Sequence, residues 1–448
     1  MSKKIIYLLS LLMALSLVFA GCKKASTAPT GEGPTKEDEV KPPSNLGYTG
    51  LFDTQTKLDE YKEKPIQQST EVAKYENGNY MRNPVITVVG GSTVVVFYEI
   101  RYQTAGAGND VALTGENAVS IAYVQSKDSG ISFSTTGMGE PKFVGGAASS
   151  GAADAHGAPI VFNTGDKIVV VASAGIGLSS GVYQAGTKES KLQYSVATIT
   201  GDTVGDFGEW KDITFDNKYG YTQFGTHSAR GTVADEGKTL LLPVTLADYT
   251  QNPSKFGYVL YTGTVNGDKV TWTQKGNKVD MPNSSGVVKE TRIPKGTSDS
   301  DYVYLAVSSD KVRISQGKNS GNPTETPIVG SDGSAGTLVV NNWQGATSYD
   351  PSNYANSGTK QAILSHVLGT EQNLAIRLVD ENFASQTSGN FALGGAYEAN
   401  AKSSSMDVLK DGTIVMIAEG GKVTDAATRP FYIYFSRFSQ AYIANKTK

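Results

Sequence analysis

The chain has 448 residues, of which 39% are hydrophobic, 19% are charged and 50 are glycine. This length allows a large single core or several domains, and the glycine content together with 23 tyrosines favours turn-rich β-structure over helix. The formal net charge of -3 supplies no basic face, so we expect no nucleic-acid partner.

The N-terminus has the pattern of a signal peptide over residues 1–21. Lys3 and Lys4 precede the apolar run IIYLLSLLMALSLVFA, and small residues stand before Cys22. The AGC sequence resembles the lipobox of bacterial lipoproteins, in which this cysteine is acylated. We therefore expect lipidation at Cys22, a membrane tether through the lipid and a bacterial cell-envelope location, either periplasmic or at the outer surface. The alternative is cleavage upstream, which leaves Cys22 as an unpaired thiol.

Residues 22–45 are expected to form a lipidated, disordered stalk. Pro, Lys, Glu and Thr dominate this segment, and large apolar side chains are nearly absent. Such a composition buries too little surface to offset the entropy lost on ordering. Residues 46–75 are interpreted as an N-terminal extension, in which KLDEYKEK is compatible with a turn or two of helix. The folded domain is expected over residues 76–448.

Six similar turn-and-strand segments recur along that domain. Each has a turn followed by a β-branched or aliphatic run, which is typical of a β-hairpin. The segments are GGSTVVVFYEI from Gly90, NTGDKIVVVAS from Asn163, DEGKTLLLPVT from Asp235, SDSDYVYLAVS from Ser298, SGTKQAILSHV from Ser357 and KDGTIVMIAEG from Lys410. Intervals of about 50 to 75 residues suit one four-stranded propeller blade per copy. We predict an all-β, six-bladed β-propeller, with a sandwich or a β-helix as the alternative architecture.

The segment SKDSGISF fits the Asp-box motif S-x-D-x-G-x-[TS]-[WF] at every specified position. Ser126 and Asp128 are expected to fix a tight hairpin by side-chain to backbone hydrogen bonds. Gly130 supplies a backbone conformation that other residues avoid, and Phe133 packs between strands. The role of this motif is structural.

The chain resembles the sialidase (neuraminidase) superfamily of six-bladed propellers from about Tyr80 to Ile443. The segments that carry the resemblance follow one another in the family's order: YMRNPVITV, YEIRYQTAGAGND, SKDSGISF, GTHSARGTVADEGKTLLLPV, NNWQGA with EQNLAIRLVD, SSSMDVLKDGTIVMIAEG and IYFSRFSQAYI. The resemblance implies exo-α-sialidase chemistry on terminal sialic acid. In that chemistry three arginines clamp the sugar carboxylate, a glutamate activates a tyrosine nucleophile, and an aspartate is the acid and base.

Part of this machinery matches the sequence. Arg82 matches the first clamp arginine, Arg101 matches the arginine beside the acid loop, and Glu419 matches the glutamate that orients Arg82. Asp110 would be the catalytic acid and base, in a loop about three residues longer than usual. Glu290 stands near the position of the activating glutamate. These five residues are the substrate-binding and catalytic candidates that the resemblance implies.

Other positions depart from the family. Ser403 stands where the nucleophilic tyrosine is expected, and Tyr397 could replace it only if the entry to the strand is rebuilt. Glu371 stands where the family has a clamp arginine, and Ser308–Ser309 occupy the place of the other. A serine is a poor replacement for tyrosine without a neighbouring base. The clamp is therefore expected to bind a carboxylate less well.

Structural interpretations stand beside the functional ones. Arg82 with Glu419 could be a buried ion pair joining the first and last blades, and Asp110 could be a solvated residue of a Gly-rich loop. Asp154 and His156 lie near a position where the family often has Asp-Pro. The three histidines have no zinc spacing, so no cofactor or metal is expected, although calcium in an Asp-rich loop stays an open alternative.

Three hypotheses follow. The first is an active sialidase that releases sialic acid from host glycans. The second is a catalytically degenerate sialidase that binds sialylated or other host glycans. The third is a structural or adhesive surface module with no sugar ligand.

Overall fold

The computed structural model describes residues 55–448 except for 75–77, 103–111, 134–140, 181, 216–218, 282–286, 293–301, 308–309, 317–323, 331–335, 344–358, 370, 382, 384, 386 and 422–430. The signal peptide, Cys22 and the stalk lie outside the described residues. Among the described helices, none has the length and apolar character needed to cross a membrane.

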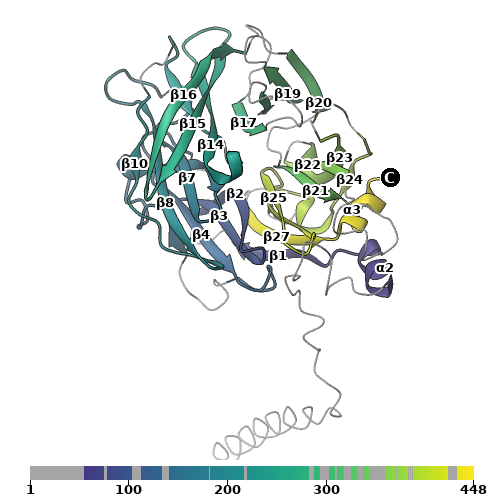
Figure 1. The fold of residues 1–448 in the computed structure, drawn as a ribbon. Coiled ribbons are helices and arrows are strands. Elements are labelled where there is room, and N and C mark those ends of the chain that lie inside the picture. The colour runs from purple at the N-terminus through teal and green to yellow at the C-terminus, as the bar shows by residue number, and fades with distance from the viewer. Residues whose placement is uncertain are drawn as a thin grey trace, which may run out of the picture. The chain divides into compact units, whose positions relative to one another are not determined.

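The described strands form six sheets, which follow one another along the chain (Figure 1). The first contains β2 (Tyr80–Val89), β3 (Thr93–Arg101), β4 (Val119–Ser126) and β5 (Lys142–Phe143). The second contains β6 (His156–Asn163), β7 (Lys167–Gly175), β8 (Ser190–Thr200) and β10 (Lys211–Asp212), with β9 (Thr203–Val204) on β8 and β12 (Ala229–Arg230) parallel to β6. The third contains β11 (Gln223–Gly225), β14 (Thr239–Asp248), β15 (Lys255–Asn266) and β16 (Lys269–Asp280), with β13 (Thr232–Ala234) on β14.

The remaining three sheets each have four strands. The fourth contains β17 (Val287–Arg292), β18 (Tyr302–Val307), β19 (Asp310–Gln316) and β20 (Thr324–Gly330). The fifth contains β21 (Gly336–Trp343), β22 (Thr359–Gly369), β23 (Gln372–Val379) and β24 (Phe391–Ala392). The sixth contains β25 (Ser404–Val408), β26 (Ile414–Gly420), β27 (Tyr432–Phe438) and β1 (Gln67–Ala73). Short 3-10 turns are η2 (Ala152–Asp154), η3 (Asp235–Gly237) and η5 (Gly395–Tyr397).

The prediction of an all-β propeller arrangement is confirmed. Among the described residues the arrangement has five blades, whereas we predicted six. The sheets pack side by side in the order fifth, sixth, first, second, third and fourth, through β21 with β25, β25 with β2, β2 with β6, β8 with β11, and β14 with β17. Neighbouring sheets therefore pack against one another in succession, as the blades of a propeller do. Neither a sandwich nor a β-helix has this arrangement.

The six recurring segments occupy the same place in successive sheets. Each apolar run forms the second strand of its own sheet, namely β3, β7, β14, β18, β22 and β26. The β2–β3 turn shows why the turn residues recur, because Gly90 and Gly91 have φ of +60° and +85°. Glycine adopts these values without the steric cost that a Cβ atom adds.

The N-terminal extension contributes to the last sheet. Helix α2 (Gln55–Glu63) precedes β1, which pairs antiparallel with β27, so part of the predicted extension is a strand of the propeller. Helix α2 packs on the C-terminal helix α3 (Gln440–Lys446), and Ser439 Oγ donates a 2.6 Å hydrogen bond to the carbonyl of Tyr61. Strand β1, near the start of the described chain, therefore completes the sheet formed by β25, β26 and β27 near its end.

The turn from Ser126 to Phe133 has a dense set of local hydrogen bonds. Ser126 Oγ donates to Asp128 at 2.6 Å and accepts from the amide of Gly130 at 2.7 Å, and the amide of Ser132 donates to Asp128 at 2.9 Å. Gly130 has φ of +92°, and a Cβ there would lie 2.1 Å from the Phe435 ring. Phe133 is buried and packs edge-on against the same ring.

Candidate functional site

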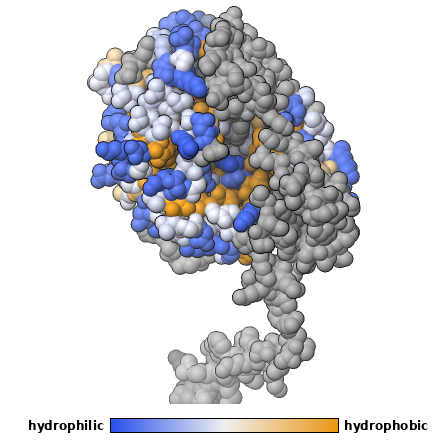
Figure 2. Space-filling view, viewed as in Figure 1, coloured by the Kyte–Doolittle hydropathy of each residue, from blue (hydrophilic) through white to orange (hydrophobic). Residues whose placement is uncertain are grey.

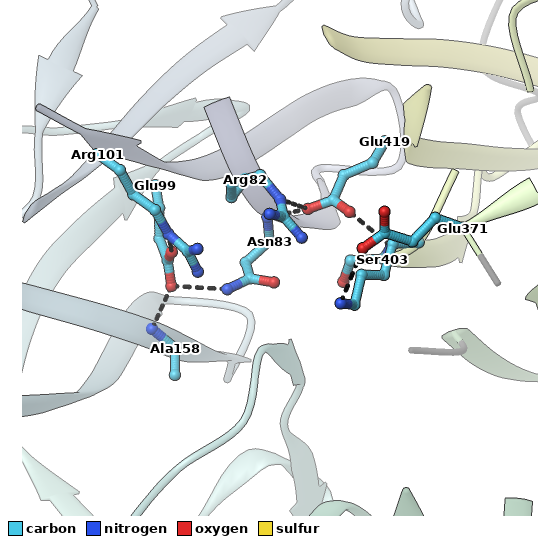
Figure 3. Close-up of polar contacts among 9 residues, drawn as sticks. Arg82, Asn83, Glu99, Arg101, Ala158, Glu371, Ser403 and Glu419 are labelled. Atoms are coloured by element: carbon cyan, nitrogen blue, oxygen red, sulfur yellow. Dashed lines mark hydrogen bonds and ion pairs between the residues drawn. The ribbon is translucent and has the colours of Figure 1, made fainter. Parts of the chain in front are cut away.

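A buried ion pair joins the first sheet to the last. Arg82 Nε donates to Glu419 Oε1 at 2.9 Å, and the backbone amide of Asn83 donates to the same oxygen at 2.7 Å (Figure 3). The register of β2 against β3 shifts between Arg82 and Val85, where Asn83 takes φ of +54° and Pro84 follows. Asparagine tolerates this backbone conformation, and proline has no amide that the irregular pairing could leave unbonded.

The carboxylate and the guanidinium of this pair have further contacts. Glu419 Oε2 accepts a 2.9 Å hydrogen bond from the amide of Ser403, and the amide of Glu419 donates back to the Ser403 carbonyl at 2.8 Å. The Arg82 guanidinium carbon lies 3.7 Å from the centre of the Phe431 ring, which is a cation–π distance. Arg82 is 4% exposed and Glu419 is fully buried, so the guanidinium is fixed in place.

A second charged pair lies beside the first. Arg101 Nε donates to Glu99 Oε2 at 2.7 Å, and Glu99 Oε1 accepts from Asn83 Nδ2 at 2.9 Å and from the amide of Ala158 at 2.5 Å. Glu99 and Arg101 are two residues apart on β3, so their side chains leave the same face of the strand. Asn83 therefore connects the two pairs, through its amide to Glu419 and its side chain to Glu99 (Figure 3).

The electrostatics of the second pair favour its charged form. Burial by itself would raise the pKa of Glu99, but the charge of Arg101 and the hydrogen bonds from Ala158 and Asn83 outweigh it, and the pKa lies below its ordinary value. Burial lowers the pKa of Arg101 and the nearby charge of Arg82 adds to this, whereas Glu99 and Glu419 oppose it. An ion pair at this depth depends on such added hydrogen bonds to compensate for lost hydration.

A third pair involves Glu371, which stands where the family has a clamp arginine. Glu371, between β22 and β23, accepts a 3.2 Å hydrogen bond from Lys402 Nζ, next to Ser403 in the chain. Figure 3 shows Glu371 beside Glu419 and Ser403. Ser403 is 1% exposed, and its Oγ is a buried atom that has no hydrogen-bond partner within the described part of the chain.

Figure 2 shows one face of the molecule, where a hollow has hydrophilic residues next to hydrophobic ones.

Tyr397, the candidate substitute nucleophile, lies in the protein core. Its side chain is fully buried in the cluster that includes Met406 and Tyr434, and its hydroxyl is 2.7 Å from Ser436 Oγ on β27. Burial raises the pKa of the Tyr397 phenol far above its ordinary value. This position favours a packing role over attack on a substrate.

Several other candidates are not among the described residues of this site. Asp110 and Ser308–Ser309 lie outside the described residues, and Glu290 lies in β17, whose backbone alone is described. Asp154 accepts hydrogen bonds from Ser150 and Gly151, which lower its pKa to about 2 although desolvation acts to raise it.

His156 belongs to a separate cluster of the second sheet. Its ring stacks on Trp210 at 4.0 Å, and its Nε2 lies 2.5 Å from Gln193 Oε1. Burial lowers the pKa of His156, against the hydrogen bonds that act to raise it. Within the described residues no group of three or more His, Cys, Asp or Glu side chains is arranged to hold a metal ion.

Among the described residues, five contributors to the site were not predicted from the sequence. Glu99 could have been found, because it stands two residues before Arg101 on a predicted strand. Asn83 adjoins Arg82 and precedes a proline, which is a signal for an irregular strand. Ala158, Lys402 and Phe431 gave no signal, because each reaches the site by long-range packing.

No family model matches the sequence, and no curated protein matches it either. Solved structures do match in fold. Trypanosoma rangeli sialidase in complex with sialic acid superposes with a TM-score of 0.59 at 14% identity, covering 86% of this chain and 60% of that chain. A Dyadobacter fermentans protein of unknown function gives 0.55 at 13% identity, over 84% and 98% of the two chains.

The intramolecular trans-sialidase from Ruminococcus gnavus gives a TM-score of 0.54 at 10% identity, over 85% of this chain and 98% of that one. This chain spans about 60% of the length of the trypanosomal sialidases that it matches. Identities this low show a shared fold alone. The chain therefore has the propeller fold of sialidases, and its chemistry has to be argued from its own site.

Proposed function

We propose that this protein is a glycan-binding member of the sialidase fold, with its ligand site at Arg82, Asn83, Glu419 and the neighbouring ion pairs. The observation that carries the proposal is the fixed guanidinium of Arg82, paired with Glu419 and stacked on Phe431. Fixed charged and amide groups suit hydroxyl-rich ligands, because a sugar hydroxyl both donates and accepts hydrogen bonds.

The same site supports binding better than hydrolysis. A serine nucleophile needs a base within hydrogen-bond reach. Glu419 accepts a hydrogen bond from the amide of Ser403, but no described group forms a hydrogen bond with Ser403 Oγ. The Tyr397 hydroxyl is buried against Ser436. Binding without cleavage is therefore the function that the geometry favours.

A glycan array tests the proposal directly. The mature chain is expected to bind a defined set of glycans, and Arg82→Ala is expected to lose that binding. Lys127→Ala, on the exposed turn after β4, is the matched control and should bind as the native protein does. Failure of well-folded protein to bind any glycan would contradict the proposal.

An exo-α-sialidase is the second candidate. The shared fold favours it, as does the match of Arg82 and Glu419 to two positions of the family. In this case Asp110, Glu290 and Arg101 would complete the chemistry. A fluorogenic sialoside assayed from pH 4 to 8 separates the two: release above the buffer blank that is lost in Asp110→Asn would favour the enzyme.

We further propose that Cys22 is lipidated and tethers the mature protein to the bacterial cell envelope through a stalk over residues 22–45. The charged start, apolar run and AGC sequence support this. Cys22→Ser should move the protein from the membrane to the soluble fraction, without changing the unfolding of the domain. A native protein that is soluble in the cell envelope would contradict the tether.

Two finer structural proposals accompany the function. The hydrogen bonds around Ser126 and Asp128 support an Asp-box at this turn. The packing of β14 on β17 supports the fourth sheet as a sixth blade. Closure of a six-bladed ring would bring this sheet against the fifth.

A further inference from the structure

The charges of the candidate site are balanced. Among the described residues, Arg82 pairs with Glu419 at 2.9 Å, Arg101 with Glu99 at 2.7 Å, and Lys402 with Glu371 at 3.2 Å (Figure 3). Three cations thus face three carboxylates. A ligand with its own negative charge gains less from a cation that is already paired than from an unpaired one, because the carboxylate beside that cation repels it.

The third pair is the one that a ligand would meet first. The Lys402 and Glu371 side chains are 35% and 14% exposed, whereas the side chains of the other two pairs are at most 10% exposed. Glu371 is held by its backbone as well, because its carbonyl accepts a 3.1 Å hydrogen bond from the amide of Ala401 and its φ is +55°. A fixed carboxylate therefore stands at the accessible edge of the site.

An uncharged sugar fits these groups better than an acidic one. Its hydroxyls can donate to the Glu371 carboxylate and accept from the guanidinium of Arg82. The carboxylate of an acidic sugar offers acceptors alone, so a carboxylate bound at this edge would place oxygen lone pairs against Glu371.

We infer that the site selects glycans ending in an uncharged hexose and rejects those ending in a carboxylated sugar, with Glu371 as the residue that sets the selectivity. This inference rests on the proposed function and goes beyond it by naming the ligand class. Lys402 is a positioning residue, because it holds the Glu371 carboxylate by the 3.2 Å hydrogen bond.

Matched glycan pairs test the inference. Each pair presents the same oligosaccharide ending in galactose, with and without a terminal sialic acid, titrated against the mature protein by calorimetry. The native protein is expected to bind the uncharged member at least tenfold more tightly. Glu371→Arg is expected to reduce that ratio at least tenfold, and Glu371→Gln to reduce it less, because it removes the repulsion without adding attraction.

A charge reversal elsewhere controls for net charge. Glu209 is exposed on the loop before β10, so Glu209→Arg should leave the ratio unchanged. Thermal unfolding of each variant shows whether it is folded, and Glu371→Gln keeps the test open if Glu371→Arg is not.

The outcomes are distinct. Tighter binding of the sialylated member by the native protein overturns the inference while leaving the proposed function intact. A ratio unchanged in both Glu371 variants overturns the role of that residue. Absence of binding to either member by folded protein that binds other glycans on the array overturns the inference alone, whereas absence of binding to any glycan overturns the proposed function and the inference with it.

Discussion

Arg82 and Glu419 are 337 positions apart in the chain and 2.9 Å apart in the structure. They bring together the first strand of the first sheet and the second strand of the last one. The contact that joins the first and last sheets is therefore also the centre of the candidate site. The structural and functional interpretations of this pair are not alternatives, because a guanidinium that binds a ligand has to be held in place.

Glu419→Ala should lower the free energy of unfolding by about 3–5 kcal/mol, because it leaves the buried Arg82 guanidinium without its counter-charge. Urea unfolding followed by fluorescence measures this. The double variant Arg82→Met with Glu419→Leu should recover most of the loss, since it buries no unpaired charge. A loss below about 1 kcal/mol in Glu419→Ala would indicate a solvated pair and contradict the burial described above.

Asp128→Ala should destabilise the protein by about 1–2 kcal/mol, since the amide of Ser132 and Ser126 Oγ lose their acceptor. Gly130→Ala should cost more, because its Cβ would meet the Phe435 ring at a positive φ. Lys127→Ala, which is exposed, is the control and should stay within about 0.5 kcal/mol of the native protein. Equal stability of all three variants would contradict a structural role for this turn.

Stability should fall with acid through Glu99. Its pKa in the folded protein lies below the ordinary 4.5, so the folded state binds fewer protons than the unfolded state between these two values. The stabilisation is therefore complete above about pH 4.5 and lost as the pH falls through the folded pKa. Urea midpoints between pH 3 and 7 should change less in Glu99→Gln than in the native protein. If the urea midpoints of the two proteins depend on pH to the same extent, Glu99 is not in its charged, paired form.

Removing residues 1–73 should lower the thermal midpoint by at least several degrees compared with removing residues 1–54. The longer deletion removes α2 and β1, so β27 loses its hydrogen-bonded neighbour and α3 loses its packing partner. An exposed strand edge also favours aggregation. Equal midpoints for the two deletions would mean that β1 adds nothing to the last sheet.

The fold was largely predictable because its signals are local. The turns at Gly90 and Lys410 carry glycine or aspartate before an apolar run, and strands β3 and β26 follow as expected. Strand β1 was not predicted, because QQSTEVA alternates weakly and its partner lies at the other end of the chain. Pairing over such a distance leaves no local pattern in the sequence.

The site was predictable in part. Arg82, Arg101 and Glu419 were candidates and lie together, in direct contact or through Asn83. The Lys402–Glu371 pair was not foreseen, because it joins the β22–β23 turn to the segment before β25. Tyr397 was proposed from its distance to Ser403 along the chain, and such a distance does not show that η5 buries the ring.

The most direct test of the proposed function is a crystal structure of the mature protein with the glycan that binds best on the array. A terminal sugar with its hydroxyls within about 3.2 Å of Arg82, Asn83 or Glu371 is the expected result. A glycan bound on a different face, with the Arg82–Glu419 pair unchanged and uncontacted, would contradict it.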